Sequence, residues 1–189
     1  MVDFIEIYDD VITSKQCDGI IQYLESNPKK KAGYPPVKNS TECPDNYFSR
    51  ETYIDRLISP ILLDNVRLYA EKYKSVDLVE QWGLDNLYNI QKYDIGKGYD
   101  FSHCENGGWS LMRRQLVWSI YLNTVNGGTH FDEYDRTVEA VSGRLLIFPA
   151  GWTHTHRGII CHDSVKYITT GWFSIMDKTQ PLYPGNVIY

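Results

Sequence analysis

The pattern of hydrophobic and polar positions predicts two helices in the first part of the chain. Residues 3–12 alternate loosely between apolar and polar side chains, which predicts an opening strand. A helix is expected to begin at Thr13 or Ser14 and to end near Asn27 and Pro28. Its apolar face carries Cys17, Ile20, Ile21 and Leu24. The buried stripe of a second helix is formed by Tyr53, Leu57, Ile58, Ile61, Leu62, Val66, Tyr69 and Ala70.

After Asp77 the periodicity changes from helical to strand-like. Strands are expected at 87–95, 99–104, 112–123, 136–140, 144–148, 152–157 and 165–175, with glycine-containing turns between several of them. Short strands after two helices predict a mainly β fold with flanking α-helices. Its core would be a double-stranded β-helix of the jelly-roll or cupin type, braced by the N-terminal helices.

The length of 189 residues suits a single domain. We expect 1–82 to hold the first strand, the helices and a long polar loop, 83–177 to form the jelly-roll core, and 178–189 to be a C-terminal tail. The polar segment Lys29–Arg50 is too long for a simple connection, which leaves two interpretations, a mobile loop or a lid over a substrate.

Composition narrows the function classes. The net charge of −5 argues against a nucleic-acid partner. No apolar stretch is long enough for a membrane span, and the first residues lack the features of a signal peptide. The four cysteines have no paired spacing, so reduced thiols in a cytoplasmic protein are expected. The aromatic fraction of 14% favours a β-rich body.

His103 and Glu105 are the strongest candidates for metal ligands. On an extended strand the two side chains would project to the same face, and a nitrogen with an oxygen ligand forms two thirds of the facial triad typical of non-haem Fe(II). When a His-x-Glu motif occurs without other motifs around it, its two side chains more often form a polar pair that faces solvent. The third ligand must come from a distant segment, where His154 and His156 are both candidates.

Several further segments follow in a fixed order. They are Tyr93-Asp-Ile-Gly96-Lys-Gly98-Tyr99 before His103-x-Glu105, then Arg114 to Tyr121-Leu122-Asn123, Gly127-Gly128-Thr129-His130-Phe131, Gly143 to Pro149, a distal histidine, Lys166, and Trp172 six positions later. From Tyr93 to about Phe173 the chain resembles the prolyl 4-hydroxylase-like branch of the 2-oxoglutarate- and Fe(II)-dependent dioxygenases. The family usually has Asp at the position of Glu105.

The resemblance implies metal ligands at His103, Glu105 and a distal histidine. His156 lies ten residues before Lys166, which is the usual separation in this branch, so we choose His156. His154 is then expected to contact substrate or to support a ligand from behind.

The resemblance also assigns the co-substrate. Lys166 would pair with the distal carboxylate of 2-oxoglutarate, and Tyr93, Tyr121 and Thr129 could donate hydrogen bonds to it. Arg114 would reach toward substrate or the pocket rim. Each residue also has an ordinary structural interpretation. Lys166 could be a solvated lysine, the tyrosines could be core residues with satisfied hydroxyls, and Arg114 could form a surface ion pair.

Other polar and aromatic residues are assigned to the structure. His130 and Asp132 form a second His-x-Asp pair, which we reject as ligands because too few residues separate it from the distal histidine. His130 is expected on a strand of the barrel wall, and His162 in a solvent-facing loop. Trp118 and Trp172 are expected in the core.

The resemblance implies a dioxygenase that uses Fe(II), 2-oxoglutarate and O2, with ascorbate as a further candidate cofactor, and that hydroxylates an unactivated C–H bond, whereas the spacing alone implies only a metal and carboxylate site. By analogy with the branch, a prolyl residue of a peptide or protein is the leading substrate, and a free amino acid or other small molecule is the alternative. The protein is expected to be a monomer or weak homodimer. Two rivals are a non-catalytic jelly-roll binding module and a cupin-like Zn or Mn enzyme that needs no Lys166.

Overall fold

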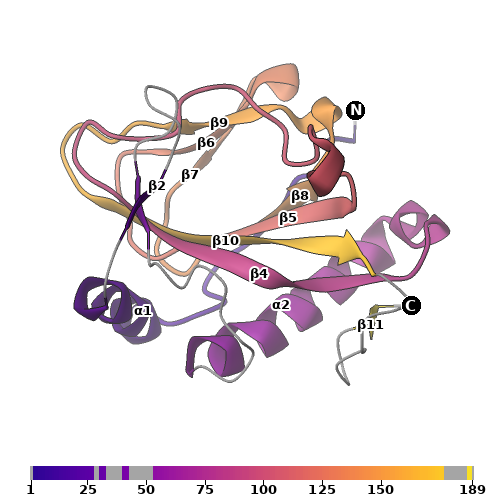
Figure 1. Ribbon diagram of the computed structural model, residues 1–189, viewed down its shortest axis with the longest axis horizontal. Coiled ribbons are helices and arrows are strands. Elements are labelled where there is room, and N and C mark those ends of the chain that lie inside the picture. Colours follow the sequence, from indigo (N-terminus) through magenta and orange to yellow (C-terminus); the bar gives the residue numbers. More distant parts are fainter. Residues whose placement is uncertain (1, 28–29, 33–39, 43–52, 177–186, 189) are drawn as a thin grey trace.

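The computed structural model describes residues 2–27, 30–32, 40–42, 53–176 and 187–188, which form two antiparallel sheets and two α-helices (Figure 1). The sheets lie one above the other, and both helices lie on the outer side of the larger sheet. This architecture confirms the predicted fold class, a mainly β jelly-roll core braced by N-terminal helices. The site lies between the two sheets.

The larger sheet has eight strands in the order β1-β8-β5-β10-β4-β3-β2, with β11 also paired with β4. Its strands are β1 (Glu6–Tyr8), β2 (Lys30–Ala32), β3 (Ser40–Glu42), β4 (Trp82–Tyr93), β5 (Arg114–Tyr121), β8 (Leu145–Pro149), β10 (Lys166–Ile175) and β11 (Val187–Ile188). The central strands β5 and β10 are covered on both faces, which explains why they read as almost continuous apolar runs.

The smaller sheet has the order β7-β6-β9, with β6 (Gly128–Phe131), β7 (Arg136–Glu139) and β9 (His156–Ile159). A short 3-10 helix, η3 (Asp132–Tyr134), connects β6 to β7. At the start of β6, a Cβ atom on Gly128 would collide with the carbonyl oxygen of Val138. Glycine at position 128 is therefore required by the close approach of the two backbones.

Both helices begin and end close to where the sequence predicts. Helix α1 (Ser14–Ser26) starts with a capping box, in which Thr13 accepts from the Gln16 amide and the Gln16 side chain accepts from the Thr13 amide. It ends before Pro28, as expected for the residue that precedes a proline. Helix α2 (Tyr53–Lys72) buries a stripe that includes Ile54, and Tyr53 itself is exposed.

Two apolar clusters hold the layers together. The first lies between the helices and the larger sheet, with members such as Ile20, Leu62 and Trp118. The second lies between the two sheets and includes Phe131 and Phe148. The second cluster forms the apolar wall beside the site.

Three predicted features differ from the structure. Residues 99–104 form no strand, and only His103 takes part in an isolated bridge; the turns of the β4–β5 connection interrupt any longer ladder. Residues 152–157 are divided between the 3-10 helix η4 (Trp152–His154) and β9. Within Lys29–Arg50, the described parts form the β2–β3 hairpin on β4, whereas the predicted lid lies outside the described residues, as does most of the predicted tail.

None of the described helices is both long enough and apolar enough to cross a membrane.

Candidate metal and co-substrate site

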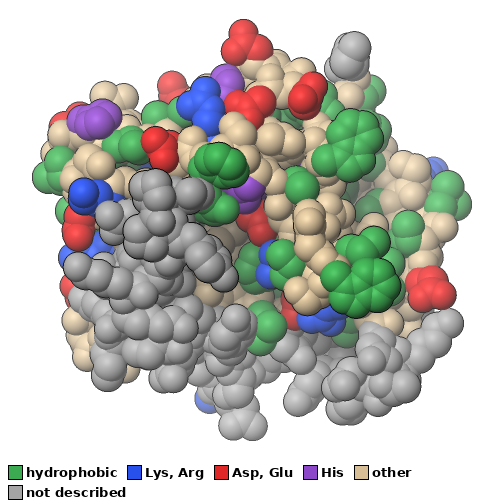
Figure 2. Space-filling view, turned by 45° about the horizontal axis from the view of Figure 1, so that its top comes forward, with side chains coloured by type: hydrophobic (Ala, Val, Ile, Leu, Met, Phe, Trp, Pro, Cys, Tyr) green, Lys and Arg blue, Asp and Glu red, His purple; other side chains and the backbone are tan. Residues whose placement is uncertain are grey.

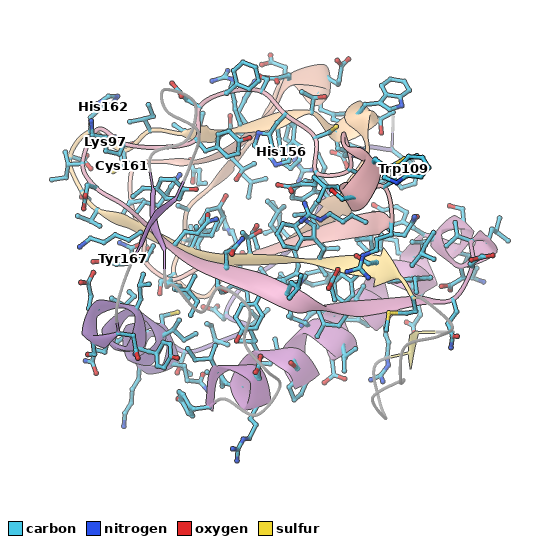
Figure 3. The ribbon with its side chains drawn as sticks, viewed as in Figure 1. Lys97, Trp109, His156, Cys161, His162 and Tyr167 are labelled. Carbon is cyan, nitrogen blue, oxygen red and sulfur yellow. The ribbon has the colours of Figure 1, made fainter. Side chains whose placement is uncertain are left out.

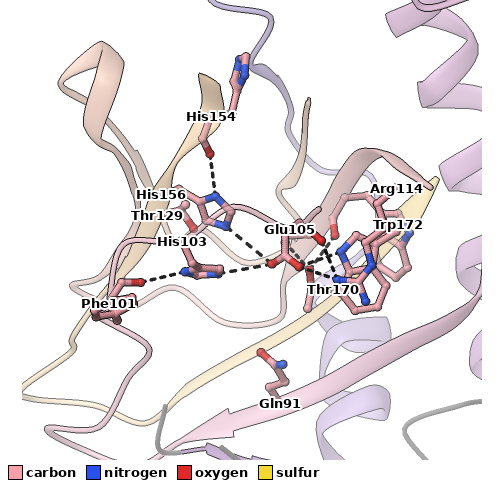
Figure 4. A network of polar contacts seen from close by, with 12 residues as sticks. Gln91, Phe101, His103, Glu105, Arg114, Thr129, His154, His156, Thr170 and Trp172 are labelled. Atoms are coloured by element: carbon pink, nitrogen blue, oxygen red, sulfur yellow. Dashed lines mark hydrogen bonds and ion pairs between the residues drawn. The ribbon is translucent and has the colours of Figure 1, made fainter. Parts of the chain in front are cut away.

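Two remote segments bring His103, Glu105 and His156 together. His103 and Glu105 lie in the connection between β4 and β5, and His156 is the first residue of β9. The main chains of His103 and His156 pair as an isolated antiparallel bridge, with N–O distances of 3.0 and 2.9 Å. One ligand-capable atom from each of the three side chains lies within 4.8 Å of the others (Figure 4). Among the described residues, this is the only such group of His, Cys, Asp or Glu.

Hydrogen bonds fix the tautomers of both histidines. His103 Nδ1 lies 2.8 Å from the carbonyl oxygen of Phe101, and His156 Nδ1 lies 2.9 Å from that of His154. A carbonyl oxygen only accepts, so each Nδ1 carries a proton, and in the neutral form of either ring Nε2 presents the lone pair. This is the arrangement in which a backbone carbonyl orients an imidazole ligand.

His156 lies in apolar surroundings. Its ring packs against Phe131 and Phe148, with centroid distances of 5.8 and 4.8 Å, and points into the space between the sheets (Figure 3). Burial, together with the charge of His103, lowers the pKa of His156 to about 4. The ring is therefore neutral at physiological pH and available as a ligand.

Glu105 is the anionic member of the group. Its Oε1 lies 3.4 Å from His103 Nε2 and 3.9 Å from His156 Nε2, and its Oε2 accepts from Arg114 and Trp172. Burial alone would raise the pKa of Glu105, but the His103 hydrogen bond and the charges of His156, His103 and Arg114 outweigh it and lower that pKa to about 2. Two imidazoles and one carboxylate are the donor set preferred by non-haem Fe(II).

Lys166 is a buried cation near the same strand as His156. Its side chain donates to the carbonyl oxygen of Ile159 at 3.2 Å, and its Nζ lies 5.1 Å from the centroid of the Tyr93 ring. No carboxylate among the described residues forms an ion pair with it. Burial lowers the pKa of Lys166 to about 8. Such an ammonium group can receive the carboxylate of a small ligand.

Tyr121 and Thr129 lie beside this cation. The Tyr121 hydroxyl and Thr129 Oγ1 are 2.7 Å apart and both residues are buried. Thr129 pairs with Gly158 across the smaller sheet, and a Cβ atom on Gly158 would lie 3.5 Å from Lys166 Nζ. Gly158 thus leaves space in front of the ammonium group. Ile159, whose carbonyl oxygen accepts from Lys166, is three positions after His156, about 10 Å further along β9.

Tyr93 also borders Lys166, but its hydroxyl donates to Gln91 Oε1 at 2.8 Å. It contributes its ring to the wall beside the ammonium group.

The sequence predicts substrate contacts for Arg114 and His154, and in the structure both side chains bond to protein atoms. Arg114 Nη1 donates to the carboxylate and the backbone carbonyl of Glu105, at 3.0 Å each. His154 belongs to a 3-10 turn, so it does not share a strand face with His156. Its Nε2 donates to the carbonyl oxygen of Asp3 at 2.7 Å, and Figure 4 shows the ring directed away from the cluster.

The rejected pair His130 and Asp132 lies outside the cluster. His130 is on β6, as expected for the barrel wall, and its Nδ1 lies 2.9 Å from Thr137 Oγ1. Asp132 pairs with Arg157 at 3.2 Å. His162 is exposed in the loop before β10, far from His156 in Figure 3.

Sequence reasoning missed two residues of the site. Trp172 is buried as predicted, but its indole N–H also donates to Glu105 Oε2 at 3.0 Å. Its place in the sequence motif, six positions after Lys166, could have indicated a role in the site. Gly158 follows His156 by two positions, and this i+2 spacing on a strand could have indicated an inward position.

Comparison of the sequence with known protein families and with curated proteins finds no match. Solved structures are similar, however. The viral collagen prolyl hydroxylase of Paramecium bursaria Chlorella virus 1, in its 2-oxoglutarate complex, has a TM-score of 0.67 at 14% identity, covering 92% of this chain and 97% of that chain. The Trichoplax adhaerens prolyl hydroxylase, in complex with a peptide fragment of the hypoxia inducible factor oxygen degradation domain, has a TM-score of 0.69 at 14% identity, covering 92% and 84%. The chain has the prolyl hydroxylase fold.

The prolyl hydroxylase fold is not limited to one reaction. The non-haem α-ketoglutarate-dependent epimerase SnoN of nogalamycin biosynthesis is also similar to this chain, with a TM-score of 0.67 at 12% identity, covering 94% of this chain and 79% of that chain. Reaction and substrate must therefore be argued from the residues of the site.

Proposed function

We propose that this protein is an Fe(II)- and 2-oxoglutarate-dependent dioxygenase that hydroxylates an unactivated C–H bond. Two observations together carry the proposal. The side chains of two histidines and one glutamate converge on a single point, and the ammonium group of Lys166 is buried with no carboxylate partner in the described part of the chain. His103, Glu105 and His156 would hold the metal. The similarity of the fold to keto-acid-dependent enzymes supports the same assignment.

Three of the side chains would hold the metal, and three others would bind the co-substrate. Bound Fe(II) would supply the oxidation of C–H by O2, coupled to decarboxylation of the keto acid to succinate and CO2. His103, Glu105 and His156 would hold the metal through two nitrogen atoms and one oxygen atom, a donor set that in non-haem Fe(II) enzymes leaves positions open for other ligands. Lys166 pairs with the distal carboxylate, with hydrogen bonds from Tyr121 and Thr129.

A prolyl residue of a peptide or protein is the proposed substrate. A surface groove of about 450 Å³ begins at Cys104 and Asn106, which flank Glu105, and is lined further out by Trp109, Met112 and Trp152. Trp109 is 91% exposed and Trp152 is 76% exposed, which is unusual for residues of this size. Figure 2 shows His, acidic and basic side chains in a hollow with large hydrophobic side chains on its rim. Exposed indole faces next to a reaction centre favour stacking with apolar rings such as proline.

A free amino acid or other small molecule is the second candidate substrate, supported by the similarity to the epimerase. A panel of proline-containing peptides and free amino acids, analysed by mass spectrometry for the gain of one oxygen atom, separates the two.

Release of succinate tests the reaction itself. Succinate is expected only when Fe(II) and 2-oxoglutarate are both present, and His103→Ala should abolish it. Lys166→Ala should act through the apparent affinity for 2-oxoglutarate. A binding module would release no succinate under any condition. Unchanged kinetics of the Lys166→Ala variant would remove the co-substrate assignment and favour a cupin-like Zn or Mn enzyme.

A further inference from the structure

The two carboxylate oxygens of Glu105 have different partners. Oε1 faces the imidazoles, 3.4 Å from His103 Nε2 and 3.9 Å from His156 Nε2. Oε2 faces the other way and accepts from Arg114 Nη1 and Trp172 Nε1, both at 3.0 Å (Figure 4). One oxygen therefore belongs to the cluster, and the other is occupied by two N–H donors.

The two donors are themselves fixed. The guanidinium carbon of Arg114 lies 3.4 Å from the centroid of the Trp172 ring, so the two side chains are stacked. Arg114 Nη1 also donates to the backbone carbonyl of Glu105. Arg114 begins β5 and Trp172 lies in β10, and these strands are neighbours in the larger sheet. The donors thus stand on a paired, rigid part of the sheet rather than on a loop.

We propose that Arg114 and Trp172 are positioning residues that hold Glu105 to the metal through one oxygen only. This inference rests on the proposed metal site. A free carboxylate can bind a cation with either or both oxygens, but here Oε2 already receives two hydrogen bonds. Oε1 alone remains for the metal, and the coordination position that a second oxygen would take stays open for the keto acid or O2.

The same pair explains how a glutamate serves at position 105. Its side chain is longer than that of aspartate and has more rotamers, so the carboxylate needs external contacts to select one. Arg114 and Trp172 select the rotamer in which Oε1 faces His103 and His156. With aspartate, shorter by one methylene, the carboxylate cannot maintain both sets of contacts, so Glu105→Asp is expected to weaken metal binding.

Charge alone predicts that removal of Arg114 strengthens metal binding, which is the opposite of what a positioning role predicts. A guanidinium near a divalent cation repels it, so its removal would strengthen cation binding if charge alone mattered. If Arg114 positions Glu105, its removal weakens binding. Trp172→Phe removes one N–H donor without any change of charge, and it provides an independent measurement.

The test is the affinity for Mn(II) alone, measured by isothermal titration calorimetry on the full chain without keto acid. In Arg114→Gln and in Trp172→Phe, the dissociation constant should rise about 10- to 100-fold, as found when groups that orient metal ligands are removed. Arg113→Gln and Trp118→Phe are matched controls. Arg113 pairs with Asp85 at 2.9 Å, and the buried Trp118 indole N–H has no hydrogen-bond partner among the residues that the structure describes. Both controls should bind Mn(II) as the wild type does.

Arg114→Lys is the second variant at this position, since it keeps the charge and loses the planar fork, and it should also weaken binding. Unchanged or tighter Mn(II) binding in the folded Arg114 variants, or wild-type binding in Trp172→Phe, would overturn the positioning role.

Failure of the proposed function gives a different result. The wild type would then bind Mn(II), His103→Ala would not, and no succinate would be released, while the calorimetric comparison would still decide the role of the pair.

Discussion

The main chains of His103 and His156 bond to each other in both directions, with N–O distances of 3.0 and 2.9 Å, and their rings lie 4.5 Å apart between centroids. This bridge joins the β4–β5 connection to the first residue of the smaller sheet. The relative position of the two imidazoles is therefore set by backbone pairing, not by side-chain packing alone. The backbone bridge that holds the β4–β5 connection to the smaller sheet therefore also brings the two imidazoles together.

The pH dependence of co-substrate binding should follow Lys166. Burial lowers its pKa to about 8, so the free protein has the ammonium group below pH 8 and loses it above. Because the carboxylate of 2-oxoglutarate needs that charge, kcat/KM for 2-oxoglutarate should be level below pH 8 and fall about tenfold per pH unit well above it. Steady-state kinetics of succinate release measure this profile. Lys166→Arg, if it turns over, should remove the fall, and a wild-type profile that is level to pH 10 would contradict the assignment.

Removal of the Tyr121 hydroxyl should weaken 2-oxoglutarate binding. Tyr121 and Thr129 share a 2.7 Å hydrogen bond beside Lys166. If they also bind the co-substrate, Tyr121→Phe should raise KM for 2-oxoglutarate roughly three- to tenfold, the value of one hydrogen bond. Tyr69→Phe is the control, because that hydroxyl donates to the Phe4 carbonyl in another part of the core. Equal effects of the two variants on stability, with KM unchanged in both, would make Tyr121 a core residue only.

Trp109 should contribute to peptide binding. Its exposed indole lines the groove that begins beside Glu105. Trp109→Ala is expected to raise KM for a proline-containing peptide about tenfold, in the range of an aromatic residue at the centre of an interface, and to leave KM for 2-oxoglutarate unchanged. Leu78, which is 85% exposed but does not line the groove, gives the control Leu78→Ala. If both variants behave alike, the groove is not the peptide site.

Gly171 should not tolerate a side chain. A Cβ atom there would lie 2.6 Å from Trp118 Cζ2 and 2.8 Å from Tyr88 Cβ, so the closely packed ring and backbone would have to move. Gly171→Ala is expected to lower the free energy of unfolding by about 1–3 kcal/mol, as overpacked cores do. Urea denaturation measures the change. Gly108→Ala is the control, because its Cβ would approach no atom closer than 3.8 Å, and it should be close to neutral.

Local pattern accounts for the parts of the fold that the sequence predicts well. The capping residue Thr13 and the apolar spacing behind it determine α1, since both signals lie within a few turns of the chain. The i, i+2 spacing of His103 and Glu105 predicts side chains that lie together, and their Nε2 and Oε1 atoms are 3.4 Å apart. The reason is only partly the predicted one, because His103 forms an isolated bridge with His156 and Glu105 lies in the turn that follows, so no extended strand carries the pair.

The resemblance pointed to His156, but only the tertiary structure shows why His154 does not join that pair and what Arg114 contacts. His154 and His156 are equivalent by alternation, but a 3-10 turn ends at His154, and the Asp3 carbonyl from the N-terminal segment accepts from its ring. From the sequence, Arg114 is expected at the pocket rim. In the structure, β5 pairs with β10, and this pairing places the Arg114 guanidinium over the Trp172 ring. These outcomes depend on contacts between residues far apart in the chain, and periodicity contains no information about such contacts. The sequence therefore specifies the chemical groups and their local spacing, and the closure of the sheets determines which of them meet.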